Sequence, residues 1–139
     1  MGRQVIRPIS LLVSILVLAG CTTFEGVGCP AGFNRSLNSE MFFGRNSAGV
    51  EIVSDADWQR SLDEEVAPRF PGGFTVVDAR GQWRGDGGTI ERERAKIIRL
   101  VLKLSDNESS RVGAIRSAYK TRFHQESVLL TSSPTCASF

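Results

Sequence analysis

The densest group of residues that could do chemistry lies between positions 82 and 96. Its members are charged or hydrogen-bonding side chains: Gln82, Trp83, Arg84, Glu91, Arg92, Glu93, Arg94 and Lys96. On an extended strand, alternation places Arg92, Arg94 and Lys96 on one face. Glu91 and Glu93 fall on the opposite face. Three cations in a row suit an anionic ligand that carries a phosphate or carboxylate group.

Glu40 extends this group, because its strand is expected to pair with the strand that carries the three cations. The predicted ligand-binding residues are Glu40, Trp83, Arg84, Arg92, Arg94 and Lys96. The competing interpretation is a solvated hairpin with cross-strand ion pairs, each worth up to about 1 kcal/mol. We favour this second interpretation, because a mixed run of charge is typical of a solvated surface.

Other candidate catalytic side chains lack partners in the sequence. His124 is the single histidine, and its ordinary pKa near 6.5 suits acid–base chemistry. It falls at the end of a predicted helix, where a cation complements the helix dipole. Tyr119 and Trp58 lie on apolar helical stripes and are expected in the core. We therefore predict no catalytic residue and no cofactor.

The chain has three cysteines, Cys21, Cys29 and Cys136. With one histidine and no CxxC spacing, a metal site is not expected. Cys21 is assigned to lipid by the motif described next. Cys29 and Cys136 then form a disulfide, stay as two free thiols, or include one reactive thiol. We prefer the disulfide, because exported proteins fold in an oxidising compartment.

Residues 1–20 have the pattern of a secretory signal. Arg3 and Arg7 precede an apolar run of ten residues from Ile9 to Leu18, which is shorter than the 20 or so that a membrane span needs. Residues 18–21 (LAGC) match the lipobox of bacterial lipoproteins. The alternatives are an ordinary cleaved signal and an uncleaved anchor. We predict cleavage before Cys21 and lipidation of that cysteine.

Lipidation anchors the mature chain at the cell envelope. Thr22 follows the cysteine, whereas an aspartate there favours inner-membrane retention in many Gram-negative bacteria. For a Gram-negative host, we therefore expect an outer-membrane lipoprotein that faces the periplasm. Residues 21–139 have 15 basic and 15 acidic side chains. The net charge of +2 belongs to the signal, and nothing here indicates a nucleic-acid partner.

The remainder divides into a flexible tether, residues 21–34, and one domain, residues 35–139. Strands are predicted over 37–44, 74–83, 89–104 and 127–131, with turns at 45–49 and 85–88. One helix starts at a Ser54–Asp57 capping box and ends before Pro68. Its apolar stripe is Trp58, Leu62 and Val66. The second helix follows Ser110, with Val112, Ile115, Tyr119 and Phe123 at helical spacing.

The order β-α-β-β-α-β predicts an α+β ferredoxin-like sandwich, with a four-stranded antiparallel sheet and both helices on one face. Right-handed crossovers place the last strand beside the first, then the third, then the second. The end of the last strand and the start of the first then share one edge of the sheet. Cys136 and Cys29 lie just outside those two points, which agrees with a disulfide.

Four segments resemble a known family when taken together. They are SEMFFG from Ser39, VAPRFPGGFTVVDARGQWR from Val66, IERERAKII from Ile90 and YKTRFHQESVL from Tyr119. The family consists of short bacterial proteins known only as a domain of unknown function, often preceded by a lipoprotein or secretory signal. The resemblance spans about 35–133, and Ala95 departs from an expected serine. It implies one compact domain and no particular activity.

Two functions remain open from the sequence. The first is a membrane-tethered, non-enzymatic binding or structural module. Its sheet is apolar on both faces, with Phe42 and Phe43 pointing opposite ways, so a homodimer through the open face is expected. The second is an enzyme for a small anionic substrate, as in dimeric α/β barrels. That function requires one deep pocket that holds Glu40, Arg92 or Arg94, and His124 or Tyr119.

Overall fold

The computed structural model describes residues 28–84, 87–104 and 107–139. The predicted signal peptide, Cys21 and the first half of the predicted tether (residues 21–27) lie outside these residues. The elements, in chain order, are β1 (Asn34–Gly44), β2 (Asn46–Ser47), β3 (Val50–Glu51), α1 (Asp55–Ser61), η1 (Leu62–Val66), β4 (Thr75–Arg84), β5 (Ile90–Lys103), α2 (Glu108–Phe123) and β6 (Leu129–Ala137).

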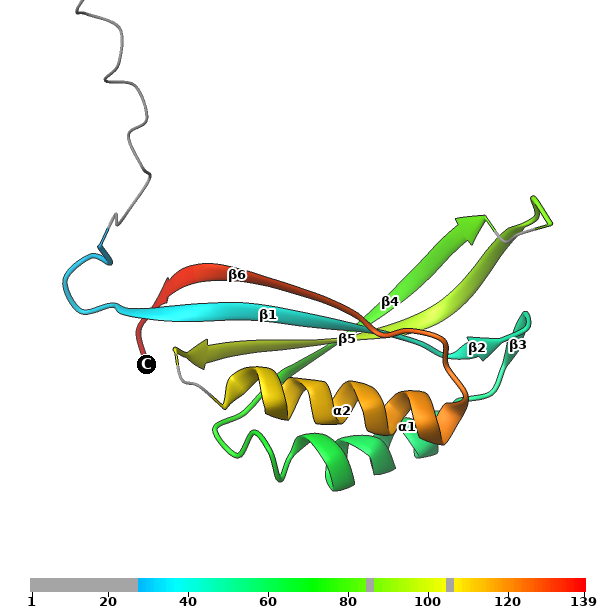
Figure 1. Ribbon diagram of the computed structural model, residues 1–139, viewed down its shortest axis with the longest axis horizontal. Coiled ribbons are helices and arrows are strands. Elements are labelled where there is room, and N and C mark those ends of the chain that lie inside the picture. The colour runs from blue at the N-terminus through cyan, green and yellow to red at the C-terminus, as the bar shows by residue number, and fades with distance from the viewer. Residues whose placement is uncertain (1–27, 85–86, 105–106) are drawn as a thin grey trace, which may run out of the picture.

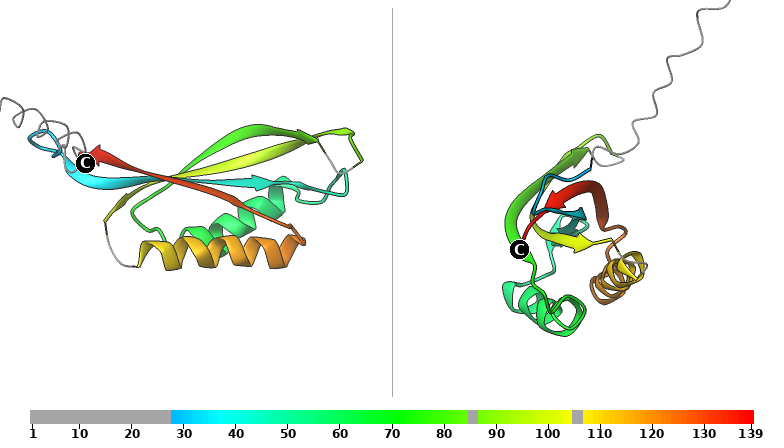
Figure 2. Two further views of the ribbon diagram at one scale, coloured as in Figure 1. Left: turned by 45° about the horizontal axis from the view of Figure 1, so that its top comes forward. Right: turned by 90° about the vertical axis from the view of Figure 1, so that its left-hand side faces the viewer.

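The main sheet has the predicted order, β4-β5-β1-β6, and every neighbouring pair is antiparallel. Figure 1 shows the helices together on one side of this sheet, and the end-on view in Figure 2 separates the two layers. The ferredoxin-like prediction is confirmed. None of the helices in the described residues covers the other face of the sheet, which is called the open face below.

Alternation along the strands explains the core. On β1, Met41 and Phe43 are buried against the helices, and on β5 the even-numbered Ile98, Leu100 and Leu102 share that side. The predicted stripes of both helices supply the opposite wall, as the burial of Trp58 and Tyr119 shows. Helix and sheet therefore bury one apolar layer between them.

The first helix begins at Ser54 and ends before Pro68, as predicted, but its last turn has a different geometry. Ser54 is the N-cap, and it forms a reciprocal capping box with Asp57. After Ser61 the helix widens into a π-helical turn, η1, in which the Ala67 amide donates to the Leu62 carbonyl at 2.8 Å. Val66 remains buried on the core side, so the wider turn preserves the apolar stripe.

Other boundaries also differ from the prediction. The second helix begins at Glu108, before the predicted cap at Ser110. The predicted turn at 45–49 contains a small hairpin of β2 and β3, closed by Ala48 and Gly49 with positive φ. The strand predicted over 127–131 runs instead from Leu129 to Ala137. Pro134 is accommodated because β6 is an edge strand, where a missing backbone donor costs little. The serine-rich sequence pairs with β1 along its length.

A disulfide joins Cys29 to Cys136, with 5.5 Å between their Cα atoms. It ties the residues just before β1 to the end of β6, as expected from the antiparallel pairing of these strands. We call this end of the molecule the tether pole, because the chain enters the domain here. The C-terminus lies at the same end (Figure 1).

Candidate functional site

Most of the predicted cluster of charges lies on an arm, the part of β4 and β5 that extends past the helices in Figure 1 (residues 79–84 and 90–95), and Lys96 follows it directly. Its two faces differ. The helix-side face carries the cations Arg80, Arg84, Arg92 and Arg94. Trp83, Glu91 and Glu93 lie on the side continuous with the open face. The structure therefore divides the predicted residues between two faces.

The predicted cations of this region already have polar partners. Lys96 is paired with Asp78, and the Arg94 guanidinium lies 3.3 Å from Glu51 and 3.4 Å from Asp55. The Lys96 ammonium holds the pKa of Asp78 below its usual range.

The two cations nearer the tip make weaker contacts. Arg92 donates to the Gln82 amide oxygen at 2.9 Å, and Arg84 donates to the Gly88 carbonyl at 3.3 Å. Among described residues, no carboxylate pairs with Arg80, which lies directly opposite Arg94. Most of this face is thus a cross-strand polar network.

Arg45 is a site residue that the sequence reasoning missed. Its side chain is 1% exposed, and its Nε donates to the Val53 carbonyl at 2.7 Å. Its guanidinium also pairs with Asp55 at 2.7 Å and Glu51 at 2.9 Å. The hydrogen bond from Arg45 holds the pKa of Asp55 low. A buried charge needs such partners, so Arg45 links β1, the β2–β3 hairpin and α1.

A signal for this burial exists in the sequence. Arg45 continues the odd-numbered series of Met41 and Phe43, both of which point toward the helices. Alternation alone therefore predicts an inward arginine at the end of β1.

Glu93 has a structural partner set of its own. Its carboxylate accepts from the backbone amides of Arg45 at 3.1 Å and Asn46 at 3.0 Å. These amides lie just past the end of β1, where the chain has left the main four-stranded sheet. Gly44 lies beneath the carboxylate, and a Cβ there would come within 2.6 Å of a Glu93 oxygen. The glycine leaves room for the acid.

Tyr119 is part of the core. Its ring packs edge-on against Phe43 and Trp58, with centroids 4.8 Å and 6.0 Å away. Its hydroxyl donates to the Gly44 carbonyl at 2.8 Å, and burial raises its pKa above the usual range. The crevice beside it encloses about 10 Å³, which is about the room of one water molecule.

The residues that an enzyme would require are dispersed. Glu40 lies on the open face and pairs with Arg99 at 2.5 Å. Arg94 lies on the helix-side face, bonded to Glu51 and Asp55. His124 caps the end of α2 in the left-handed conformation and is exposed. These side chains line no common pocket among the described residues, so the enzyme hypothesis loses the geometry that it required.

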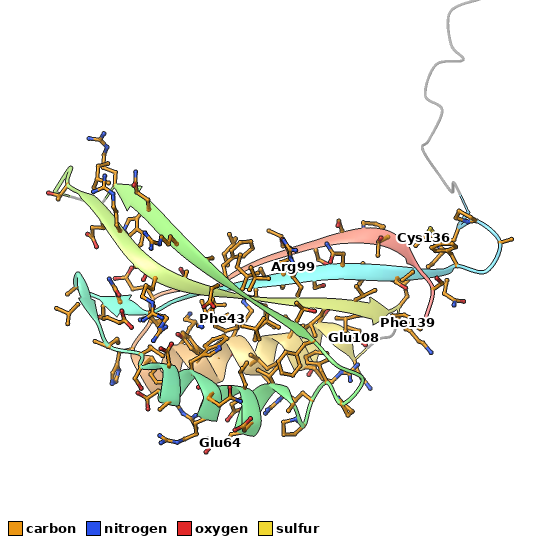
Figure 3. All side chains as sticks on the ribbon, turned by 180° about the vertical axis from the view of Figure 1, so that it is seen from behind. Phe43, Glu64, Arg99, Glu108, Cys136 and Phe139 are labelled. Atoms are coloured by element: carbon orange, nitrogen blue, oxygen red, sulfur yellow. A yellow bond between two sulfur atoms is a disulfide. The ribbon has the colours of Figure 1, made fainter. Side chains whose placement is uncertain are left out.

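The open face carries an apolar row that crosses all four strands. The pairing registers place four residues side by side, in the order Val77, Ile97, Phe42 and Leu129. Leu129 is 58% exposed, and the other three are partly exposed. A second row lies parallel to the first and consists of Thr75, Arg99, Glu40 and Thr131. Figure 3 shows Arg99 on the open face and Phe43 on the helix side.

Two further observations concern the described part of the chain. No group of three or more histidine, cysteine, aspartate or glutamate side chains comes together there in a way that would hold a metal ion. None of the helices in that part has both the length and the apolar character needed to span a bilayer.

Comparisons with known proteins place the chain in a family. Its fold is similar to a phage SAM lyase solved in complex with S-methyl-5'-thioadenosine, with a TM-score of 0.56, 18% identity, and coverage of 75% of this chain and 90% of that one. It is also similar to CutA from Synechococcus elongatus, with a TM-score of 0.49, 10% identity, and coverage of 74% and 80%. At such identities the likeness concerns fold alone. A search of curated proteins gave no match. The family described as "Protein of unknown function (DUF3574)" matches residues 38–139, in agreement with the resemblance found in the sequence, and the chain belongs to this family.

Proposed function

We propose that this protein is a lipid-anchored module of the cell envelope that acts by binding rather than catalysis, with the open face of its sheet as the contact surface. The observation that carries the proposal is the apolar row of Val77, Ile97, Phe42 and Leu129. A sheet with helices on one side leaves the other side to water, and an exposed apolar strip on it marks an interaction surface.

Three observations support the anchor. The first is the lipobox that ends at Cys21. The second is the disulfide between Cys29 and Cys136, because disulfides persist mainly in oxidising compartments such as the periplasm. The third is the short distance along the chain from lipid to domain. Seven residues separate Cys21 from Cys29, and the eight steps between the two cysteines span at most about 28 Å when extended.

The tether pole itself is suited to a membrane surface. Phe33, Leu104 and Phe139 are exposed there, and Phe139 is 91% exposed. The registers bring Arg35 and Lys103 to the same end of β1 and β5. Apolar side chains mixed with cations favour the headgroup region of a bilayer. For a Gram-negative host we propose the outer membrane, with the domain in the periplasm.

Metabolic labelling tests the anchor. Cells that express the full chain are grown with an alkyne-tagged palmitate, and the protein is examined for label and for its presence in the membrane fraction. We expect a labelled membrane protein, and a Cys21→Ser variant that carries no label. The matched control is Cys29→Ser, which keeps the lipobox and should keep the label. An unlabelled parent protein, or a labelled Cys21→Ser variant, would overturn the anchor.

A further inference from the structure

We propose that the open face is covered by a second copy of this chain, in a two-fold dimer whose axis runs parallel to the strands. This inference rests on the proposed function, because it names the partner of the open face. Its evidence is separate, and consists of the order in which side chains cross the sheet. The dimer sets two sheets face to face, as in a β-sandwich.

The apolar row is complementary to itself under this operation. A two-fold axis along the strands, between β5 and β1, reverses the order of the strands in the partner sheet. It leaves the position of each residue along the strand direction unchanged. Ile97 then faces the partner subunit's Phe42, and Val77 faces the partner subunit's Leu129. Each large side chain of the row meets an apolar side chain at the same level. The row is therefore buried without any shift of register.

The neighbouring row supplies matching charges. Arg99 and Glu40 lie next to each other on the open face and pair within one chain. The same two-fold axis places Arg99 over the partner subunit's Glu40, and the reverse contact follows by symmetry. Four charges then alternate in sign around the axis, in a site from which water is excluded. Attraction between charges is stronger at the lower effective dielectric of such a site.

Another axis in the same plane fits less well. A two-fold axis across the strands, along the apolar row, would place β5 over the partner's β5. Arg99 would then lie over the partner subunit's Ala95, so no carboxylate of the partner subunit would face it. The two tether poles would also point in opposite directions. The axis along the strands leaves both poles at one end, so both lipids can enter the same bilayer within the reach of the two short tethers.

The size of the face agrees with a stable dimer. A strand residue occupies about 3.4 Å along the strand and about 4.8 Å across it. The four strands together therefore offer roughly 700 Å² of open face, whereas a standard interface buries about 800 Å² per partner. This area includes the arms, where the Trp83 side chain is exposed on the side continuous with the open face.

The test uses charge reversal in the mature lipoprotein, purified in detergent and examined by native mass spectrometry and sedimentation. We expect the unmodified protein to be a dimer. Arg99→Glu and Glu40→Arg should each weaken self-association at least about tenfold, because each homodimer then holds four like charges. Mixed together, the two variants should form heterodimers, since every contact across that interface again joins opposite charges.

Control measurements separate loss of this dimer from unfolding and from a general effect of surface charge. Arg80→Glu changes the same type of residue on the helix-side face of the arm, and it should leave the dimer intact. Circular dichroism and the Tm show whether each variant is folded. A monomeric or trimeric parent protein would overturn the inference, and so would folded variants that fail to form heterodimers. Palmitate labelling is read separately, so a labelled monomer refutes the dimer and leaves the anchor in place.

Discussion

Replacing Gly44 with alanine should reveal how the end of β1 is held. Glycine inside a strand costs roughly 0.5–1 kcal/mol relative to alanine, so Gly44→Ala would stabilise a strand with free space above it. Here the new Cβ would lie 2.6 Å from one Glu93 carboxylate oxygen and 2.8 Å from the other. The carboxylate must therefore move. In moving, it leaves the amides of Arg45 and Asn46 that it accepts from.

The size of the effect follows from those two hydrogen bonds. A hydrogen bond to a charged group contributes about 1.5–3 kcal/mol, and the partial exposure of Glu93 favours the lower end. We expect Glu93→Ala to lower the free energy of unfolding by about 2–3 kcal/mol. Gly44→Ala should lower it by about 1–2.5 kcal/mol, because the alanine recovers about 0.5–1 kcal/mol of the loss. In a Glu93→Ala background the same change should stabilise by about 0.5–1 kcal/mol.

The test is whether the effect of Gly44→Ala on the free energy of unfolding changes sign between the two backgrounds. Urea unfolding of all four proteins, followed by tryptophan fluorescence, gives the midpoint and the slope of each transition. Gly113→Ala is the matched control: its Cβ would meet nothing within 4 Å on α2, so it should stabilise by up to about 1 kcal/mol in both backgrounds. A stabilising Gly44→Ala in the parent protein, or an equal effect in both backgrounds, would refute the reasoning.

Three other predictions concern the rest of the domain. Reducing the Cys29–Cys136 disulfide, whose cysteines are 107 residues apart, should lower the free energy of unfolding by up to about 4–5 kcal/mol; denaturation with and without dithiothreitol measures this, and a loss below about 1 kcal/mol would contradict it. Tyr119→Phe should cost about 1 kcal/mol through one lost hydrogen bond. Because burial raises the pKa of Tyr119, the parent should lose stability above about pH 10 more steeply than this variant. The hydrogen bond from Arg45 lowers the pKa of Asp55 below 3.8, so its contribution is present above that pH and is lost as the pH falls further. Asp55→Asn should therefore show a shallower loss of stability in acid unfolding scans, and an unchanged slope would count against this pairing.

The fold could be predicted because its signals are local and periodic. The stripe of Trp58, Leu62 and Val66 has helical spacing, and these residues are buried as expected. The order of elements then leaves few topologies, and the sheet order agrees with the expected one. The π-helical turn after Ser61 could not be predicted from the sequence. It keeps the same side chains on the apolar side of the helix, so the spacing of apolar residues does not reveal it. The strand through Pro134 could not be predicted either, because it depends on pairing with β1.

The partners of the predicted site residues could not be predicted, because those contacts join segments distant in sequence. The charged residues at 91–96 were evident from the sequence, and the alternation of side chains along a strand predicted that they divide between the two faces of the sheet. The acids that neutralise them come from elsewhere, as with Glu51 and Asp55 beside Arg94. Glu40 was expected near β5, and it is, beside Arg99. Its position on the opposite face from Arg94 depends on the register of β1 against β5, which the sequence alone does not reveal.

The disulfide and the open face are linked through β6. This strand lies at the edge of the sheet, and β1 is its one partner among the described strands. It nevertheless supplies Leu129 to the apolar row and Thr131 to the row of charges. Edge strands open most easily when few contacts hold them. The bond at Cys136 fixes the far end of β6, so it limits that opening and keeps the outer part of the open face in register. An exported protein gains such a bond only after it leaves the reducing cytoplasm. The proposed dimer surface would therefore reach its final form in the compartment where the proposed lipid anchor would place it.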